Sequence, residues 1–231
     1  MSQIFPKSAN ATARMSLVGV LSLVLFLGAM IFTLMRSSWA TKQNEFVEQP
    51  IQFSHAHHVG GVGLDCRYCH PTIETADRPR ATEAACLKCH QSAADDGPEF
   101  APVRAAATGG PPVNWEKVNE VPAWITFNHA RHVVRGVSCQ SCHGRVDQME
   151  LTYQAEPLSM DWCMDCHRNP APHLRRTEDL TKMGFKPPGG LHAYGHKVRN
   201  ELGINPDNGC VYCHRPRAGA PTLDEILKPT P

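Results

Sequence analysis

One motif, repeated five times, uses every cysteine in this 231-residue chain. The 10 cysteines form five Cys-x-x-Cys pairs, and a histidine directly follows each pair. This is the attachment signature of haem c, because the two thiols bond to one porphyrin and the histidine binds its iron from one side. The motifs are Cys66, Cys69 and His70; Cys86, Cys89 and His90; Cys139, Cys142 and His143; Cys163, Cys166 and His167; and Cys210, Cys213 and His214.

Three other uses of paired cysteines fit this pattern less well. Structural zinc takes such pairs two at a time, so five pairs would leave one over. Disulfides require no histidine, and a thioredoxin-like redox pair would occur once. The sequence therefore predicts five haems c, each held by two cysteines, with the five motif histidines as proximal iron ligands.

Composition indicates that the haems themselves form much of the core. Aromatic residues make up 7% of the chain, and 19 prolines and 17 glycines interrupt most long apolar stretches. The net charge of +1 offers no basic surface for nucleic acid. Residues 41–231 supply about 38 residues per motif, too few for separate cores. We expect a mainly α-helical and irregular multihaem cytochrome c fold, with short helices and loops, almost no sheet and one N-terminal transmembrane helix.

The segment 15–36 is the predicted membrane span. Arg14 and Arg36 bracket an uncharged apolar run, and twenty helical residues rise about 30 Å, enough to cross the hydrocarbon layer. A cleaved signal peptide is the alternative, and Ser38-Trp39-Ala40 resembles a cleavage site, but the apolar run is longer than a signal peptide needs. We therefore expect an uncleaved signal anchor that follows a cytoplasmic N-terminus, residues 1–14.

Haem chemistry, not charge, predicts the orientation. Two basic residues lie on each side of the span, so the positive-inside rule does not decide it. Haem c is attached outside the cytoplasm, where reduced thiols meet haem before they pair with each other. We expect a single-pass protein of the bacterial cytoplasmic (inner) membrane, with its haem domain on the periplasmic, extracytoplasmic side.

The haem domain contains an internal repeat. A Phe-x-His-x-x-His element begins at Phe53 and again at Phe127, 74 residues later. Two haem motifs follow each copy, and those of the second copy lie 73 and 77 residues after those of the first. Such self-similarity suggests a duplicated two-haem unit. The predicted parts are a first dihaem unit at 41–91, a Pro- and Gly-rich linker at 92–122, a second dihaem unit at 123–175, and a fifth-haem segment with the C-terminal tail at 176–231.

Histidines outside the motifs are candidates for the second axial position of each iron. In each repeated element two histidines stand three apart, so on a helical turn they can bind two different haems. These distal candidates are His55, His58, His129 and His132. His57 has no counterpart in the second copy and is expected at the surface. The fifth distal ligand remains open among Met160, His196, His192 and Met149, with Met183 and His173 as further candidates.

Longer stretches around the motifs resemble the pentahaem cytochrome c subunit of alternative complex III, of the multihaem cytochrome c3/c7-like kind. The resemblance covers about residues 15–175 and rests on the order of three stretches. Beyond residue 175 only the last haem motif matches. The stretches are Phe53-Ser-His-x-x-His with Gly63-Leu-Asp-Cys-Arg-Tyr-Cys-His, Phe127-Asn-His-x-x-His with Cys142-His-Gly-Arg-Val-Asp-Gln-Met, and Leu158-Ser-Met-Asp-Trp-Cys-Met-Asp-Cys-His-Arg.

This resemblance implies an electron-transfer subunit of a respiratory or photosynthetic complex that oxidises menaquinol and passes electrons to a soluble periplasmic acceptor. The implied partners are integral membrane quinol-binding subunits, an iron-sulfur subunit and a monohaem cytochrome c. Family members combine mostly two-histidine haems with one Met/His haem, which places Met160 first among the fifth-ligand candidates. Met/His ligation raises a haem's reduction potential.

Two other functions compete with electron relay. A multihaem reductase would keep one iron open for substrate, whereas here eight spare histidines and several methionines can cap five irons. A stand-alone membrane quinol dehydrogenase of the short tetrahaem kind usually carries four haems. We therefore expect a relay subunit that is not catalytic alone, and no catalytic residue is predicted.

Overall fold

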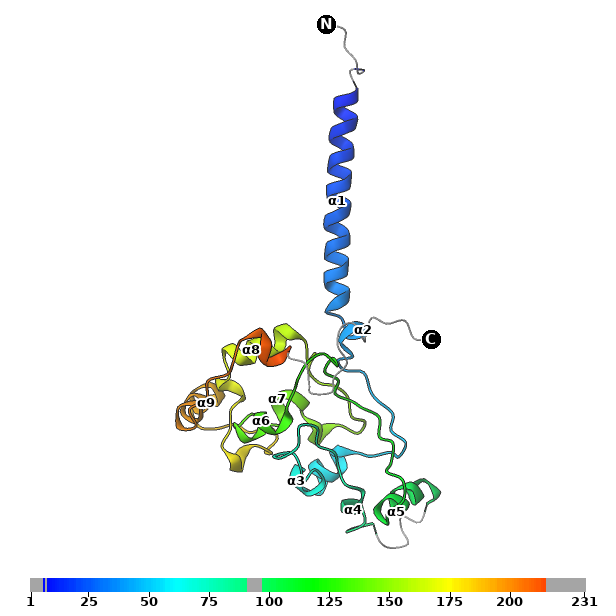
Figure 1. Cartoon of the computed structure of the whole chain (residues 1–231), viewed down its shortest axis with the longest axis vertical. Helices are drawn as coiled ribbons and strands as arrows, with labels where there is room; N and C mark the ends of the chain where they lie inside the picture. The colour runs from blue at the N-terminus through cyan, green and yellow to red at the C-terminus, as the bar shows by residue number, and fades with distance from the viewer. Residues whose placement is uncertain (1–5, 7, 91–96, 215–231) are drawn as a thin grey trace. The chain divides into compact units, whose positions relative to one another are not determined.

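The structure is a computed structural model that describes residues 6, 8–90 and 97–214 (Figure 1). It contains two compact units, Met1–Gln43 and Asn44–Pro231. Within the described residues there is no β-strand, only isolated bridges such as Phe46 with Tyr153 and Val137 with Leu174. The predicted fold class, mainly helical and irregular with one apolar N-terminal helix, is confirmed.

The first unit consists of α1 (Ala9–Met35) and the short α2 (Ser38–Thr41). Helix α1 has 27 residues, none of them buried, and reaches a mean hydropathy of 2.6. At 1.5 Å per residue it is about 40 Å long, more than the roughly 30 Å of a bilayer's hydrocarbon core. Among the described residues, α1 is thus long and apolar enough to cross a membrane.

The second unit is built from short helices joined by loops. Prolines and left-handed glycines such as Gly136 and Gly144 end or separate them, so none exceeds 12 residues. The helices are η1 (a π-helix, Ala56–Gly61), α3 (Cys66–Cys69), α4 (Glu83–Cys86), η3 (Pro98–Phe100), α5 (Ala101–Ala107), α6 (His129–Val134), α7 (Gln140–His143), η4 (Val146–Gln148), α8 (Met160–Arg168), η5 (Ala171–His173), η6 (Thr177–Asp179), α9 (Gly190–Glu201) and α10 (Cys210–Cys213).

Two helices that carry predicted ligands have side-chain N-caps. The carboxylate of Asp65 accepts a hydrogen bond from the Arg67 N–H at 2.9 Å and begins α3. The amide oxygen of Asn128 accepts one from the Arg131 N–H, also at 2.9 Å, and begins α6. Each cap satisfies a donor that has no partner inside the helix. The sequence thereby determines where the first haem motif and the second pair of distal histidines begin.

The apolar core lies in small separate clusters. One consists of Ile51, Val103 and Val113, with Phe100 and Trp115 packed against it. Val103 is only 1% exposed and belongs to α5, inside the segment 92–122 that composition predicts as a linker. The described part of that segment therefore contains a helix and a buried cluster.

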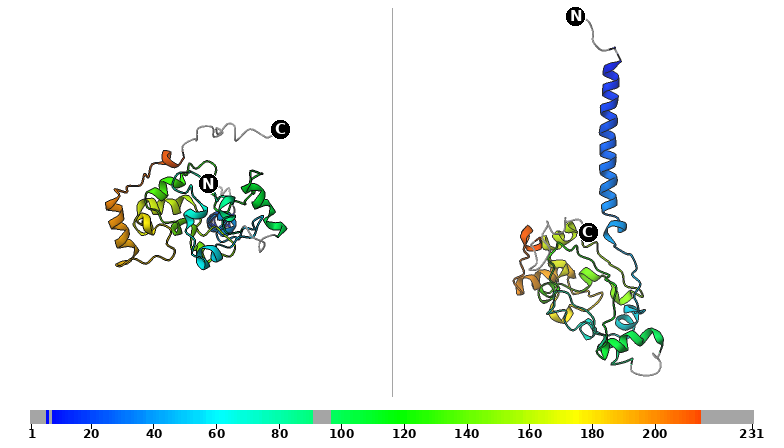
Figure 2. Two further views of the ribbon diagram at one scale, coloured as in Figure 1. Left: turned by 90° about the horizontal axis from the view of Figure 1, so that it is seen from below. Right: turned by 45° about the vertical axis from the view of Figure 1, so that its right-hand side comes forward.

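A second cluster joins α9 to η5. Leu174 and Val198 are fully buried there. Gly195 lies so close to the chain that a Cβ on it would collide with the carbonyl oxygen of Ala171, so this helix contact requires glycine. Figures 1 and 2 show α5 and α9 at opposite ends of the second unit, with α3, α6 and α7 between them.

Val103→Ala is expected to destabilise the second unit by about 2 kcal/mol, because it removes two methyl groups from a filled site and leaves a cavity. Val134→Ala is the matched control, since Val134 is 58% exposed on α6. Urea unfolding of the haem-loaded protein, followed by circular dichroism, measures both. Equal stabilities for the two variants would contradict the buried role of α5.

Candidate haem-binding centre

Each predicted haem motif forms a single helical turn. In four of them the N–H of the motif histidine donates to the carbonyl oxygen of the first cysteine at 2.9–3.0 Å, and the fifth lies inside α8. Residues three and four apart on a turn share one side, so both thiols and the imidazole can face one porphyrin. All ten cysteines are free thiols. The four bonded turns run from Cys66 to His70, Cys86 to His90, Cys139 to His143, and Cys210 to His214.

Three predicted distal histidines lie opposite motif histidines at one common spacing. A metal ion lies about 2 Å from a histidine nitrogen, so two imidazoles on opposite sides of one iron have ring centres roughly 6 Å apart. The observed centre-to-centre distances match this spacing. They are 6.0 Å for His58 and His90, 6.2 Å for His132 and His167, and 6.2 Å for His129 and His143.

The two repeated elements reproduce the same local geometry. The ring of Phe53 stacks on His58 with centres 4.5 Å apart, and the ring of Phe127 stacks on His132 at 4.7 Å. In both copies this second histidine pairs with the second haem motif of its own copy. The phenylalanine of each Phe-x-His-x-x-His element thus supports the imidazole that faces the motif histidine.

The first histidine of each element lies in a central cluster with the first motif histidines of both copies. Burial, with smaller contributions from nearby His70 and His58, lowers the pKa of His55 to about 4. Burial and the nearby His129, His70 and His55 lower the pKa of His143 to about 4. These imidazoles are therefore neutral at pH 7, the form that binds a metal.

Hydrogen bonds at Nδ1 determine which ring nitrogen stays free. A backbone carbonyl can only accept, so an Nδ1 within hydrogen-bond distance of one carries the proton, and Nε2 keeps its lone pair for a metal. Four of the predicted ligands have such a bond, and a fifth, His55, has the hydroxyl of Thr152 at 3.0 Å. The carbonyl bonds are His58 to Ser54 (2.8 Å), His132 to Asn128 (2.9 Å), His129 to Ile73 (3.1 Å) and His167 to Asp207 (2.7 Å).

These features fit haem c better than a bare metal ion. Each imidazole pair supplies two nitrogen ligands, and a porphyrin supplies the other four that an octahedral iron needs. Tetrahedral zinc would need four protein ligands. In the described ranges 6, 8–90 and 97–214, no group of three or more His, Cys, Asp or Glu side chains is gathered to hold a metal ion.

The thiols show that the first motif lies between the second and the third. Burial raises the pKa of Cys69, and the nearby Cys66 and Cys89 raise it further. A hydrogen bond with Cys139, followed by burial, raises the pKa of Cys66. The first motif thus has one cysteine beside the second motif and the other beside the third.

The series continues from the third motif to the fifth. Burial raises the pKa of Cys142 to about 12, and the nearby Cys166 and Cys163 contribute in the same direction. Burial also raises the pKa of Cys163, followed by the nearby Cys213. In space, the five motifs therefore follow one another in the order second, first, third, fourth, fifth.

The fifth-ligand candidates have different surroundings. Met160 is the first residue of α8, one turn before Cys163, and is 66% exposed. His192 and His196 lie exposed on α9, with ring centres 4.6 Å apart. No ring contact joins His214 to another residue in the described part of the chain.

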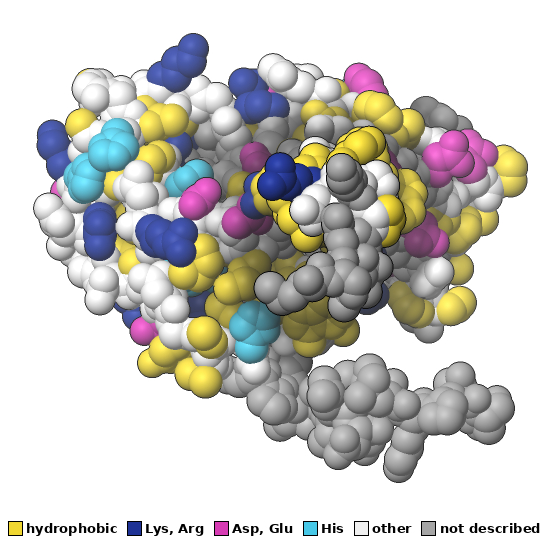
Figure 3. Space-filling model, turned by 90° about the horizontal axis from the view of Figure 1, so that it is seen from above, with side chains coloured by type: hydrophobic (Ala, Val, Ile, Leu, Met, Phe, Trp, Pro, Cys, Tyr) yellow, Lys and Arg dark blue, Asp and Glu magenta, His cyan; other side chains and the backbone are white. Residues whose placement is uncertain are grey.

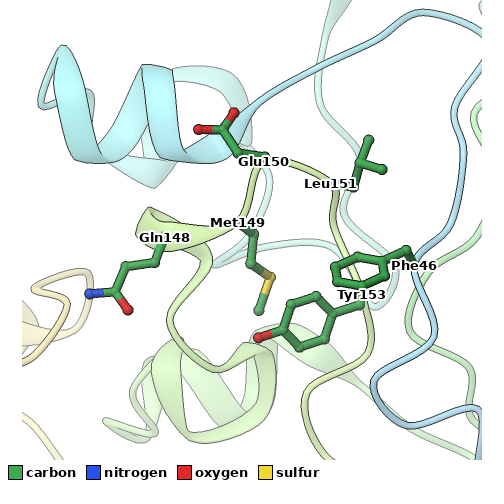
Figure 4. A pocket seen from close by; sticks show the side chains of 6 residues that line it. All are labelled: Phe46, Gln148, Met149, Glu150, Leu151 and Tyr153. Carbon is green, nitrogen blue, oxygen red and sulfur yellow. The ribbon is translucent and has the colours of Figure 1, made fainter.

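Met149 is instead packed in an apolar setting. It is 2% exposed, and its carbonyl accepts a hydrogen bond from the Ala56 N–H at 2.9 Å. It lines a cavity of about 350 Å³ in which its thioether lies beside the Tyr153 ring (Figure 4). The other lining residues are Phe46, Gln148, Glu150 and Leu151.

No sequence signal identified Thr152 as a partner of His55. The two residues are 97 positions apart in the sequence, and Thr152 belongs to none of the motifs. On the face shown in Figure 3, basic, acidic and apolar side chains are interspersed.

Comparison with known proteins agrees with this geometry. The chain is 29% identical over 178 residues to the multihaem cytochrome c subunit of menaquinone reductase from Nitratidesulfovibrio vulgaris, an alignment that covers 73% of this chain and 77% of that protein. The chain resembles a multihaem cytochrome c. No family model matches it. The similarity supports a relationship with quinone-reductase cytochromes and is not specific to alternative complex III.

His58→Ala is expected to convert one haem from low spin to high spin while all haems stay attached, because attachment depends on cysteines and His58 faces His90. His57→Ala is the matched control, since the adjacent His57 is exposed. Electron paramagnetic resonance of the oxidised protein and intact mass measure spin state and haem number. An unchanged low-spin spectrum in the His58 variant would remove that residue from the ligands.

Proposed function

We propose that this chain is the electron-relay subunit of a membrane menaquinone oxidoreductase and carries five haems c. The observation that supports it most is the common 6.0–6.2 Å spacing of three imidazole pairs, each with one member in a Cys-x-x-Cys-His turn. Capping both axial positions leaves an iron no site for substrate and suits it to outer-sphere electron transfer.

In this proposal the ten cysteines hold the haems by thioether bonds, and the protein supplies the axial ligands. The proximal ligands are the five motif histidines, and His55, His58, His129 and His132 are distal ligands. Haem iron supplies one-electron chemistry when bound. The role of this chain's own residues is to fix each imidazole with Nε2 free and to keep the sites in van der Waals proximity.

The spatial order of the motifs defines the path that we propose for electrons. The haems of the second and fifth motifs are the two ends, and that of the third motif is the middle one, next to the first motif, with which it shares the hydrogen bond between Cys66 and Cys139. An electron that enters at one end passes every haem before it leaves at the other.

Met160 is the distal ligand that we propose for the fifth haem. The four distal histidines suffice for the first four motifs, so His214 needs a partner from the remaining candidates. Cys163 lies near Cys213, and Met160 begins the same helix as Cys163 with its side chain exposed. A thioether ligand would give the haem at this end the highest reduction potential of the series.

The proposed setting is a bacterial cytoplasmic membrane, with α1 as anchor and the haems on the periplasmic side. A menaquinone reductase subunit as relative supports membrane partners. As finer proposals we retain integral quinol-binding subunits, an iron-sulfur subunit and a monohaem cytochrome c, as in alternative complex III, with menaquinol as electron donor. The name of the relative indicates the opposite direction of electron flow, the reduction of menaquinone. The same relay can carry electrons in either direction.

Purification of the native complex in mild detergent tests the relay function. We expect membrane and iron-sulfur subunits to copurify, an intact mass that exceeds the bare chain by five haems, and haem reduction by a menaquinol analogue. If a menaquinone analogue oxidises the reduced haems and a menaquinol analogue does not reduce the oxidised ones, the electrons flow toward menaquinone and not from menaquinol. A chain that purifies alone and reduces nitrite would contradict the relay and favour a reductase with an open haem.

Met160→Ala is expected to open one iron, which becomes high spin and binds carbon monoxide when reduced, while the wild-type chain binds none. Met164→Ala is the control, because Met164 lies on the same helix, α8, and is not among the candidate ligands. Optical titration with carbon monoxide measures the change. Carbon monoxide binding by the wild-type chain would indicate a naturally open site and favour the reductase alternative.

A further inference from the structure

One buried polar atom in the described ranges, Oδ1 of Asn119, has no hydrogen-bond partner. The amide nitrogen of the same side chain lies 3.2 Å from Nδ1 of His143, the proximal-ligand candidate of the third motif. An unpaired buried oxygen costs free energy, so its position beside a predicted iron ligand calls for a physical explanation.

Asn119 is held beside His143 by a short strap, residues 116–120. At one end Gln49 makes two hydrogen bonds with the backbone of Glu116, at 3.1 and 2.9 Å. At the other end the Glu120 N–H donates to the side-chain oxygen of Gln154 at 2.9 Å, and Gln154 is only 1% exposed. Two glutamines therefore anchor the backbone on both sides of Asn119.

The need of His143 for a free Nε2 decides which way the side-chain amide of Asn119 points. With its nitrogen toward His143, Asn119 would donate to Nδ1, which places the imidazole proton on Nε2 and blocks the nitrogen that must bind iron. Oxygen and nitrogen of an amide occupy nearly the same volume, and Oδ1 makes no hydrogen bond that would hold the present orientation. Turned by half a rotation, the oxygen accepts from Nδ1–H and leaves Nε2 free.

Asn119 differs from the backbone partners of four other predicted ligands. His58, His132, His129 and His167 have a backbone carbonyl at Nδ1. A carbonyl of the backbone is the same whatever residue carries it, whereas a side-chain acceptor can be made stronger or weaker by one substitution. His143 is therefore a ligand whose basicity the sequence can tune.

We propose that Asn119 is a positioning residue for the third haem: its amide oxygen accepts a hydrogen bond from Nδ1–H of His143, fixes the ring plane and sets the reduction potential of that iron. This rests on the proposed haem-binding function. Outer-shell partners of this kind raise the basicity of a histidine ligand, and a more basic ligand stabilises ferric over ferrous iron.

Two substitutions test this with opposite expected signs. Asn119→Asp offers a stronger acceptor of the same shape. The reduction potential of one haem is expected to fall by at least about 59 mV, which for one electron is a tenfold change in its ferric/ferrous equilibrium constant. Asn119→Leu removes the acceptor, and the same haem is expected to shift to higher potential with an altered low-spin g value. Asn200→Asp is the control, since Asn200 is exposed on α9.

The measurement is a spectroelectrochemical titration of the full-length, membrane-extracted protein, with electron paramagnetic resonance on the same samples. Opposite shifts at one haem, with the other potentials unchanged, support the proposal, since a purely structural role would move both variants in one direction. Wild-type midpoint potentials in both variants, with five haems attached, would overturn it. Absence of haem c from the wild-type chain would instead overturn the proposed function.

Discussion

The pairing of two imidazoles from distant parts of the chain is the constraint on which the second unit depends. His58 meets His90, and His132 meets His167, across more than thirty residues in each case. Apolar packing alone is a weak alternative, because eleven hydrophobic residues are buried in the described ranges and they lie in separate clusters. A unit of this size normally needs a larger core. Under the proposed function, the apolar faces of the porphyrins supply that missing core.

The sequence predicted the parts of this arrangement that depend on local spacing. The Cys-x-x-Cys-His turns, the paired histidines of the repeated elements and the apolar helix α1 follow from residues within a few positions of one another, and the fold class is confirmed. The roles of the site residues and the five-part division of the chain stay predictions. Three imidazole pairs nevertheless have the spacing that shared irons require.

What the sequence did not reveal depends on contacts between distant residues. Composition marks 92–122 as a linker, yet Val103 is buried there, and Asn119 contacts His143. Neither residue belongs to a periodic pattern, so nothing local distinguishes it from an ordinary loop residue. The contact of Thr152 with His55 was missed for the same reason. Side chains that hold a ligand in orientation can come from any segment that passes nearby.

The spatial order of the motifs is the order that the predicted duplication of a dihaem unit would produce. In each copy the second histidine of the Phe-x-His-x-x-His element pairs with the copy's second motif, whereas the first histidine lies in the central cluster with His70 and His143. Two copies that meet through their first motifs must place their second motifs outermost. The chain order first, second, third, fourth thereby becomes second, first, third, fourth in space.

The fifth motif extends this series at one end. Cys213 lies near Cys163 of the fourth motif, so under the proposed function the last haem adds to the outer end of the second copy and leaves the centre unchanged. Because no third Phe-x-His-x-x-His element accompanies it, the addition brings a proximal histidine but no matching distal one. A residue of the neighbouring helix, such as Met160, can then supply the distal ligand. Under the proposed function, an added haem with different ligation would differ in potential from the other four and would give the series a direction.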